Sequence, residues 1–214
     1  MKNIFYLTVL ICFSLILQSC SADEEVATTT PSQTMTDSTG ASVSLDGTYL
    51  AACKADSDNE SDKATFTISG TSMSFLRQGY TDDKCTTSKF DYKVVNTFSP
   101  GASTTASTGE TVTKNTMTSV SQDLTITAET MLTNYNGTVW NSTGMYGFRD
   151  WVSGTERDIT GLLWTGGENP VNVLGAVWYD LLYISGTSLQ MGSTTDNNST
   201  YPTELDNSSI YVKQ

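Results

Sequence analysis

The stretch from Lys63 to Gly79 reads KATFTISGTSMSFLRQG, and its alternating apolar residues indicate β-structure. Ala64, Phe66 and Ile68 recur at every second position, which places them on one face of an extended strand. The tetrapeptide SGTS at 69–72 then interrupts the run with residues typical of a tight hairpin turn. The stretch therefore predicts two antiparallel strands joined by a short turn.

The same period of two recurs along the rest of the chain. Even-numbered apolar residues form two further runs, which are Phe90, Tyr92, Val94 and Phe98, then Leu124, Ile126, Ala128 and Leu132. A second SGTS at 185–188 predicts another hairpin turn. Strands are expected near 48–54, 63–69, 72–79, 89–98, 109–118, 122–133, 157–165, 174–185, 187–192 and 208–213.

Two segments break the strand pattern. Residues 99–109 read SPGASTTASTG, which predicts an exposed loop. Near 142–154 the alternation lapses, and Met145, Phe148, Trp151 and Val152 fall at roughly helical spacing. We therefore expect one short helix there.

Many short antiparallel strands with one short helix indicate an all-β architecture, either a barrel or a sandwich. Closure into a barrel is favoured because it removes the exposed strand edges that would otherwise aggregate. A barrel of eight strands has an interior wide enough for side chains or for one small ligand. The predicted domain is an antiparallel β-barrel over residues 47–214.

Composition excludes several classes of function. The 214 residues carry 11 Lys and Arg against 23 Asp and Glu, for a formal net charge of −12. Such an acidic chain is not expected to bind nucleic acid, because phosphate contacts need clustered Lys and Arg. The chain contains no His, so a Ser-His or Cys-His nucleophile and a His-ligated metal are excluded. No cofactor is predicted.

The N-terminus has the organisation of an export signal. Lys2 precedes a 14-residue apolar run, IFYLTVLICFSLIL, which is shorter than the roughly 20 residues needed to span a bilayer. The run ends in Leu17-Gln18-Ser19-Cys20, which resembles the lipobox of bacterial lipoproteins. The resemblance implies that residues 1–19 are removed as a signal peptide and that Cys20 is acylated, anchoring the protein to the lipid bilayer. Ser21 follows in place of the Asp that retains enterobacterial lipoproteins in the inner membrane, which points to the outer membrane. The alternative is an ordinary secretory signal with an incidental Cys.

Residues 20–46 are expected to form a flexible tether after the lipidated Cys20. Eleven of the 26 residues in 21–46 are Ser or Thr, and large apolar residues are nearly absent. Such a segment buries too little apolar surface to offset the entropy lost on ordering.

Two cysteines remain in the exported domain, Cys53 and Cys85. An even pair in an oxidising compartment predicts a disulfide, which would contribute roughly 3–4 kcal/mol by limiting the unfolded chain. The alternative is two reduced, buried thiols.

Several short motifs resemble those of lipocalin-like (calycin-like) bacterial lipoproteins. They are Asp46-Gly47-Thr48-Tyr49 with Cys53, the segment GYTDDKC at 79–85, WYDLLYISG at 178–186, and YPTELD at 201–206 with Tyr211. The resemblance implies a lipocalin-like barrel and a small apolar ligand held inside it.

Three groups of residues are candidates for chemistry. Trp164, Trp178, Tyr179 and Tyr183 are candidates to line a ligand cavity, and the alternative is that they fill a packed core. Acidic residues alternate from Asp56 to Asp62, as in a calcium loop, but a solvated acidic hairpin explains them better and no metal site is predicted. Asp180 lies within the apolar run VWYDLLYIS; it is either an acid of raised pKa or, as we favour, a residue that points outward or pairs with an Arg.

Three functions are consistent with these observations. We expect a non-enzymatic, membrane-anchored barrel that binds a small apolar ligand. The main alternative is a structural or protein-interaction lipoprotein of the cell envelope. A hydrolase is the least favoured, because no spacing singles out a catalytic pair of acids, and no catalytic residue is predicted.

Overall fold

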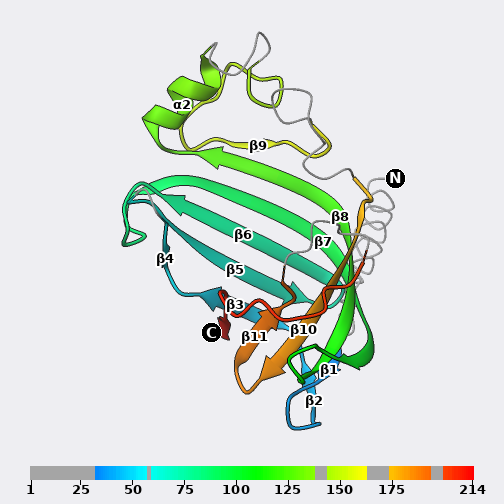
Figure 1. The fold of residues 1–214 in the computed structure, drawn as a ribbon. Coiled ribbons are helices and arrows are strands. Elements are labelled where there is room, and N and C mark those ends of the chain that lie inside the picture. Colours follow the sequence, from blue (N-terminus) through cyan, green and yellow to red (C-terminus); the bar gives the residue numbers. More distant parts are fainter. Residues whose placement is uncertain (1–31, 57–58, 138–143, 163–173, 194–199) are drawn as a thin grey trace, which may run out of the picture.

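A computed structural model gives the arrangement of residues 32–56, 59–137, 144–162, 174–193 and 200–214. The chain is predominantly β (Figure 1), and the described residues contain a single short helix. No helix of the described part of the chain is both long and apolar enough to cross a membrane.

Eight antiparallel strands close into a barrel, as the sequence predicts. Each strand pairs with the next in the order β10, β11, β12, β3, β5, β6, β7 and β8, and β8 pairs back onto β10 to close the ring. Their bounds are β3 Gly47–Ala51, β5 Ser61–Ser69, β6 Ser72–Tyr80, β7 Ser88–Thr105, β8 Thr111–Ile126, β10 Val177–Ser185, β11 Ser188–Met191 and β12 Tyr211–Lys213. Two short strands extend the sheet, β4 Lys54–Ala55 beside β5 and β9 Glu156–Asp158 beside β8.

The two SGTS segments form tight turns, in agreement with the sequence. The first joins β5 to β6 and the second joins β10 to β11, with Gly70 and Gly186 at φ of 55° and 60°. Glycine adopts this left-handed conformation without the steric cost that a Cβ atom brings. The first turn sets the register that places Phe66 opposite Phe75.

Strands β7 and β8 are longer than predicted. The expected loop at 99–109 is wrong for most of its length, because β7 continues to Thr105 and its Ser103–Thr105 end pairs with Thr111–Thr113 of β8. The segment is polar, but the backbone hydrogen bonds of a ladder do not depend on apolar side chains. The expected strands at 109–118 and 122–133 are one strand up to Ile126, with a register shift opposite Val95 and Asn96.

One end of the barrel interior is filled by side chains and covered by a hairpin. The hairpin consists of β1 Thr34–Thr36 and β2 Ser42–Ser44, and it lies at the opposite end of the barrel from the helix (Figure 1). The buried side chains at this end come from the hairpin region and from the barrel strands, and they include Met35, Leu45, Tyr49, Ile68, Met73, Phe98, Leu182, Ile184 and Leu189.

The expected tether therefore ends earlier than residue 46. Met35 is 5% exposed and Leu45 is completely buried in the barrel core. Leu45 also accepts a hydrogen bond on its backbone oxygen from the Tyr49 hydroxyl at 2.9 Å, and the Ser38 N–H donates to the Ile184 carbonyl at 2.8 Å. Two well-placed apolar side chains thus fix a segment that is otherwise rich in Ser and Thr. Residues 21–31 of the expected tether lie outside the described residues.

A second apolar cluster covers the other end of β7 and β8. Helix α2 (Glu129–Asn136) and residues 144–162 pack there through Leu132, Tyr135, Tyr146, Trp151 and Ile159. The helix expected near 142–154 is wrong, since the described part of that segment is turn and loop, and the helix begins directly after β8 instead. Met131, Leu132 and Tyr135 have helical spacing, but Leu132 also continues the even-numbered run that suggested a strand.

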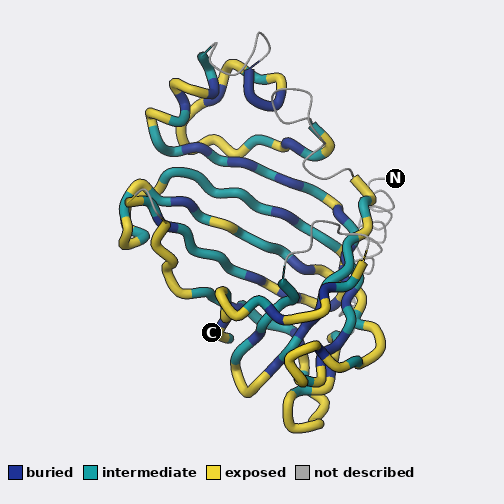
Figure 2. The backbone as a smooth tube through the Cα atoms, in the orientation of Figure 1, coloured by how far each residue is buried: buried dark blue, intermediate teal, exposed yellow. Residues whose placement is uncertain are grey.

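Cys53 and Cys85 form the predicted disulfide, with 6.0 Å between their Cα atoms. Cys53 follows β3 and Cys85 lies between β6 and β7. Because β5 pairs with both β3 and β6, the bond spans the end of a three-strand unit. Elsewhere in the barrel, buried residues alternate with less buried ones along most of β8 (Figure 2).

Candidate functional site

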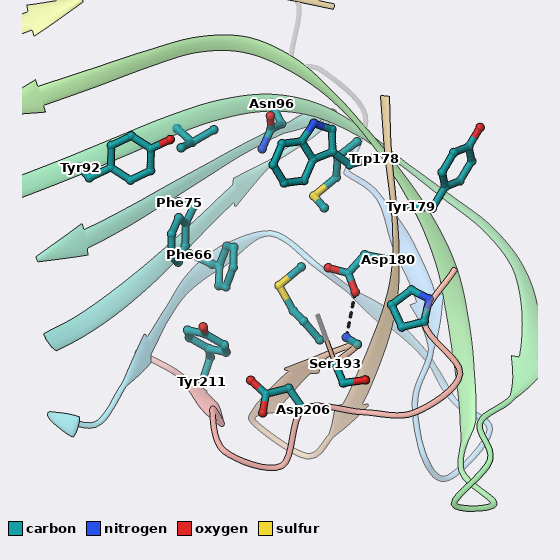
Figure 3. Close-up of a pocket in the computed structure, with 15 residues that line it drawn as sticks. Phe66, Phe75, Tyr92, Asn96, Trp178, Tyr179, Asp180, Ser193, Asp206 and Tyr211 are labelled. Atoms are coloured by element: carbon teal, nitrogen blue, oxygen red, sulfur yellow. Dashed lines mark hydrogen bonds between the residues drawn. The ribbon is translucent and has the colours of Figure 1, made fainter. Parts of the chain in front are cut away.

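A partly open cavity of about 330 Å³ lies within the barrel. Residues of seven barrel strands converge on it, together with the segment that leads into β12 (Figure 3). The apolar lining consists of Phe66, Phe75, Tyr92, Val94, Met117, Trp178, Met191, Pro202 and Tyr211. The polar lining consists mainly of Asn96, Asp180, Ser193 and Asp206.

Aromatic rings form one wall of the cavity. Phe66 lies at its centre, with its ring centroid 4.9 Å from that of Phe75 and 4.7 Å from that of Tyr211. The Phe66–Tyr211 contact is edge-to-face, which suits the opposite charge on the edge and face of an aromatic ring. These contacts hold the wall rigid, and Trp178 approaches from β10 on the other side (Figure 3).

Asp180 supplies a carboxylate to this largely apolar space. Its Oδ1 accepts hydrogen bonds from the backbone N–H groups of Leu181 at 2.7 Å and Gly192 at 2.8 Å. Burial raises the pKa of Asp180 to about 7, although both hydrogen bonds act in the opposite direction. The favoured expectation that Asp180 points outward or pairs with an Arg is wrong. The alternation of β10 places it on the inner face with Trp178 and Leu182.

The neighbouring backbone is shaped around this carboxylate. A Cβ atom at Gly192 would lie 2.7 Å from Asp180 Oδ1 and 2.6 Å from Pro202 Cγ. Only a glycine therefore allows the backbone N–H to reach the carboxylate while Pro202 closes over it. This is a requirement for space and does not involve a left-handed backbone.

A second carboxylate, Asp206, lines the cavity on the side of Tyr211. Burial raises the pKa of Asp206, but hydrogen bonds from Ser208 and Ser209 and the charge of Lys54 outweigh burial and hold it below its usual value. Burial, together with the charges of Asp206, Asp62 and Asp180, raises the pKa of Tyr211 to about 12. The potential around the Tyr211 hydroxyl is therefore negative.

Two buried polar side chains of β8 lie on the same inner face. Asn115 stands directly opposite Asp180, and Ser119 stands opposite Asn96. Asn115 is completely buried, and neither its amide nitrogen nor its amide oxygen has a hydrogen-bond partner among the described residues. The Ser119 hydroxyl is also buried without a hydrogen-bond partner among the described residues. Such groups are costly to bury, and neither residue lines the cavity itself.

The predicted cavity residues divide between the two faces of β10. Trp178 lines the cavity as expected. Tyr179 points away from the other lining side chains (Figure 3) and packs edge-to-face on Tyr201, 5.0 Å between centroids. Tyr183 packs in a separate cluster with Leu181 and Leu205. The strict alternation of a strand explains the division, and the fourth predicted residue, Trp164, lies outside the described residues.

Sequence reasoning did not assign Phe66, Phe75, Asn96 and Asp206 to a site. Phe66 was placed correctly on a buried face, but its period of two cannot distinguish a cavity wall from a packed core. Asp206 gave no signal, because it reaches the cavity from a loop that only the folded chain brings beside β11.

Two further predictions concern the acidic run at 56–62 and the lipidation site at Cys20. The acidic run at 56–62 is partly neutralised, since Asp62 pairs with Arg77 at 2.7 Å and Glu60 pairs with Lys89 at 2.5 Å. Across the described residues, no cluster of acidic and Cys side chains has the geometry to hold a metal ion. The predicted lipidation site, Cys20, lies outside the described residues.

No family model matches the chain, and no curated protein matches it either.

Proposed function

We propose that this protein is a non-enzymatic binding module whose barrel holds a small, largely apolar ligand. The observation that carries the proposal is the cavity of about 330 Å³ inside the closed barrel, lined by Phe66, Phe75 and Trp178. Ligand sites are typically preformed, apolar and equipped with a few polar groups that orient the ligand. Asp180 and Asn96 are such groups here.

The arrangement supports binding better than catalysis. The two carboxylates of the lining differ in environment. Asp206 is hydrogen-bonded to Ser208 and Ser209, but the chain contains no His that could act as a base toward either hydroxyl. Asp180 Oδ1 is fixed by two backbone N–H groups, which orient the carboxylate toward the cavity. A fixed acceptor in an apolar cavity selects a ligand by hydrogen bonding.

The proposal includes a membrane anchor at Cys20, which the N-terminal sequence supports. Acylation there, followed by the short segment up to the β1–β2 hairpin, would hold the barrel near the bilayer. Growth with labelled palmitate tests this part: the wild-type chain should take up label, and a Cys20→Ser variant should not. Equal labelling of the wild-type chain and Cys20→Ser would contradict acylation at Cys20.

Binding is tested with N-phenyl-1-naphthylamine, a neutral probe that fluoresces in apolar surroundings. Val94 and Val95 are consecutive in β7 and point to opposite faces, with Val94 lining the cavity. Val94→Phe fills the cavity, whereas Val95→Phe makes the same change on the outer face. In lipid nanodiscs, with the signal of empty nanodiscs subtracted, the wild-type chain and Val95→Phe should bind the probe and Val94→Phe should not. Equal binding by both variants would contradict the proposal.

A further inference from the structure

The cavity has an unusual balance of charge for an apolar site. Its lining includes the carboxylates of Asp180 and Asp206, and no Lys or Arg among the described residues lines it. The remaining polar side chains of the lining, such as Asn96 and Ser193, are neutral. A ligand that enters therefore meets two carboxylates and no cation in the described lining, although Lys54, which is not in the lining, acts on the pKa of Asp206.

The second carboxylate oxygen of Asp180, Oδ2, can accept hydrogen bonds from a ligand. Both of its hydrogen bonds go to Oδ1, and Oδ2 accepts none from the described residues. No positive side chain of the described residues acts on its pKa, which burial dominates. An uncompensated carboxylate at a cavity wall gains most from a partner that carries a positive charge.

The aromatic wall favours the same kind of ligand. Phe66, Phe75, Tyr211 and Trp178 surround the space that Asp180 faces (Figure 3). The faces of aromatic rings attract ammonium groups, and they also provide apolar surface for a hydrocarbon body. The combination of rings with one carboxylate can satisfy both parts of an amphipathic cation at once.

The neighbourhood of Asp180 also leaves an unused amide. Asn115 is completely buried directly opposite Asp180 on the inner face, and its amide oxygen accepts no hydrogen bond from the described residues. Asn115 does not itself line the cavity, so Asp180 is the acceptor that a ligand meets on this side. An anionic ligand would instead bring a further negative charge to a site that already holds two carboxylates.

We propose that the cavity selects small organic cations, whose aromatic or apolar body packs against Phe66 and Trp178 and whose ammonium group meets the Asp180 carboxylate. The inference rests on the proposed function and names the chemical class of its ligand. It excludes fatty acids and other carboxylates as the preferred ligand.

Three probes of one shape and different charge test the inference. They are 1-naphthylmethylamine, 1-naphthalenemethanol and 1-naphthoic acid, titrated by fluorescence against the full chain in nanodiscs at about pH 8. The amine should bind about tenfold or more tightly than the alcohol, because a charged hydrogen bond and a cation–π contact are added. The acid should bind most weakly.

The variant Asp180→Asn should reduce amine binding to the level of the alcohol and leave alcohol binding within about twofold. Asp83→Asn makes the same change of charge at an exposed loop residue, so it should leave the preference intact. The probe series on the wild-type chain needs no variant, so it decides the question even if Asp180→Asn does not fold.

The outcomes separate the two proposals. If the alcohol or the acid binds as tightly as the amine, the preference for cations is wrong while the binding function stands. If none of the three probes and no neutral apolar probe binds, the binding function itself is wrong.

Discussion

The Oδ1 atom of Asp180 accepts a hydrogen bond from the Gly192 N–H at 2.8 Å, and this contact joins β10 to the end of β11 inside the barrel. The same N–H also donates to the Leu181 carbonyl at 3.1 Å. The contact fixes the only carboxylate of the β10 inner face and shapes the cavity wall. It depends on the absence of a side chain at position 192.

Gly192→Ala should destabilise the protein by roughly 1–3 kcal/mol, because the new Cβ atom would lie 2.6 Å from Pro202 Cγ and 2.7 Å from Asp180 Oδ1. Unfolding in urea measures the change. Gly101→Ala is the control, since its nearest contact is 3.3 Å from a backbone oxygen and the expected loss is smaller. Equal stability of Gly192→Ala and the wild-type chain would contradict the described contact.

The stability of the wild-type chain should depend on the protonation of Asp180. Burial raises its pKa in the folded state to about 7, from 3.8 in an unperturbed carboxyl. The folded state therefore favours the protonated form, and the resulting stabilisation is complete below about pH 4 and is lost as the pH rises through about 7. The full difference corresponds to about 4 kcal/mol.

Asp180→Asn removes this titration and keeps an oxygen for the two backbone N–H groups. Urea unfolding at about pH 4 and about pH 8 should show that the variant gains stability relative to the wild-type chain at the higher pH. The exposed substitution Asp83→Asn should show no such gain. If Asp180→Asn and the wild-type chain have parallel pH profiles, Asp180 is not buried as described.

Reduction of the Cys53–Cys85 disulfide should lower the free energy of unfolding by about 3–4 kcal/mol, as expected for a separation of 32 residues. The double variant Cys53→Ser, Cys85→Ser should show the same loss. It should also be insensitive to reducing agent, which serves as the control. A loss well below 1 kcal/mol on reduction would argue against the entropic role of this bond.

The Asn136 side chain holds helix α2 to the loop below it. Its amide oxygen accepts from the Trp151 N–H at 2.7 Å, and its amide nitrogen donates to the Trp151 carbonyl at 2.9 Å. Asn136→Ala leaves both backbone groups without these partners and should cost about 1–3 kcal/mol. Hydrogen exchange should accelerate in 129–136 and 150–155, while the barrel strands remain protected.

The exposed neighbour Asn134 on the same helix provides the control for this prediction. Asn134→Ala should leave the exchange rates of both segments unchanged. Accelerated exchange throughout the barrel in Asn136→Ala would show instead that the helix and barrel unfold as one unit.

The barrel could be predicted from the sequence where one face of each strand is continuously apolar. Ala64, Phe66 and Ile68 on β5, and the turn at Gly70, left little choice of structure or register. The prediction of a flexible tether up to residue 46 failed because only a few apolar residues determine the structure of this segment. The β1–β2 hairpin is held by Met35 and Leu45, and a segment with two apolar anchors among many Ser and Thr residues resembles a tether.

The cavity was only partly predictable, because alternation gives the face of a residue and not the space in front of it. Trp178 and Tyr179 are both among the residues around the cavity, as predicted. Tyr179 follows Trp178 directly in one strand, so its side chain points away from the others and packs on Tyr201. For Asp180 the favoured prediction was that it points outward or pairs with an Arg, and the alternative, an acid of raised pKa, is what the structure has. The glycine at 192, which lies far from Asp180 in sequence, is what allows its burial.

The position of a bound probe shows whether the ligand lies inside the barrel. Isotope-filtered nuclear Overhauser spectra of 1-naphthylmethylamine bound to labelled protein should show contacts from the naphthyl protons to Met117 and Trp178, which line the cavity. They should show none to Tyr201, which packs on the outer side of β10 against Tyr179. Contacts to Tyr201 alone, or the absence of any contact with Met117 and Trp178 at saturating probe, would contradict ligand binding inside the barrel.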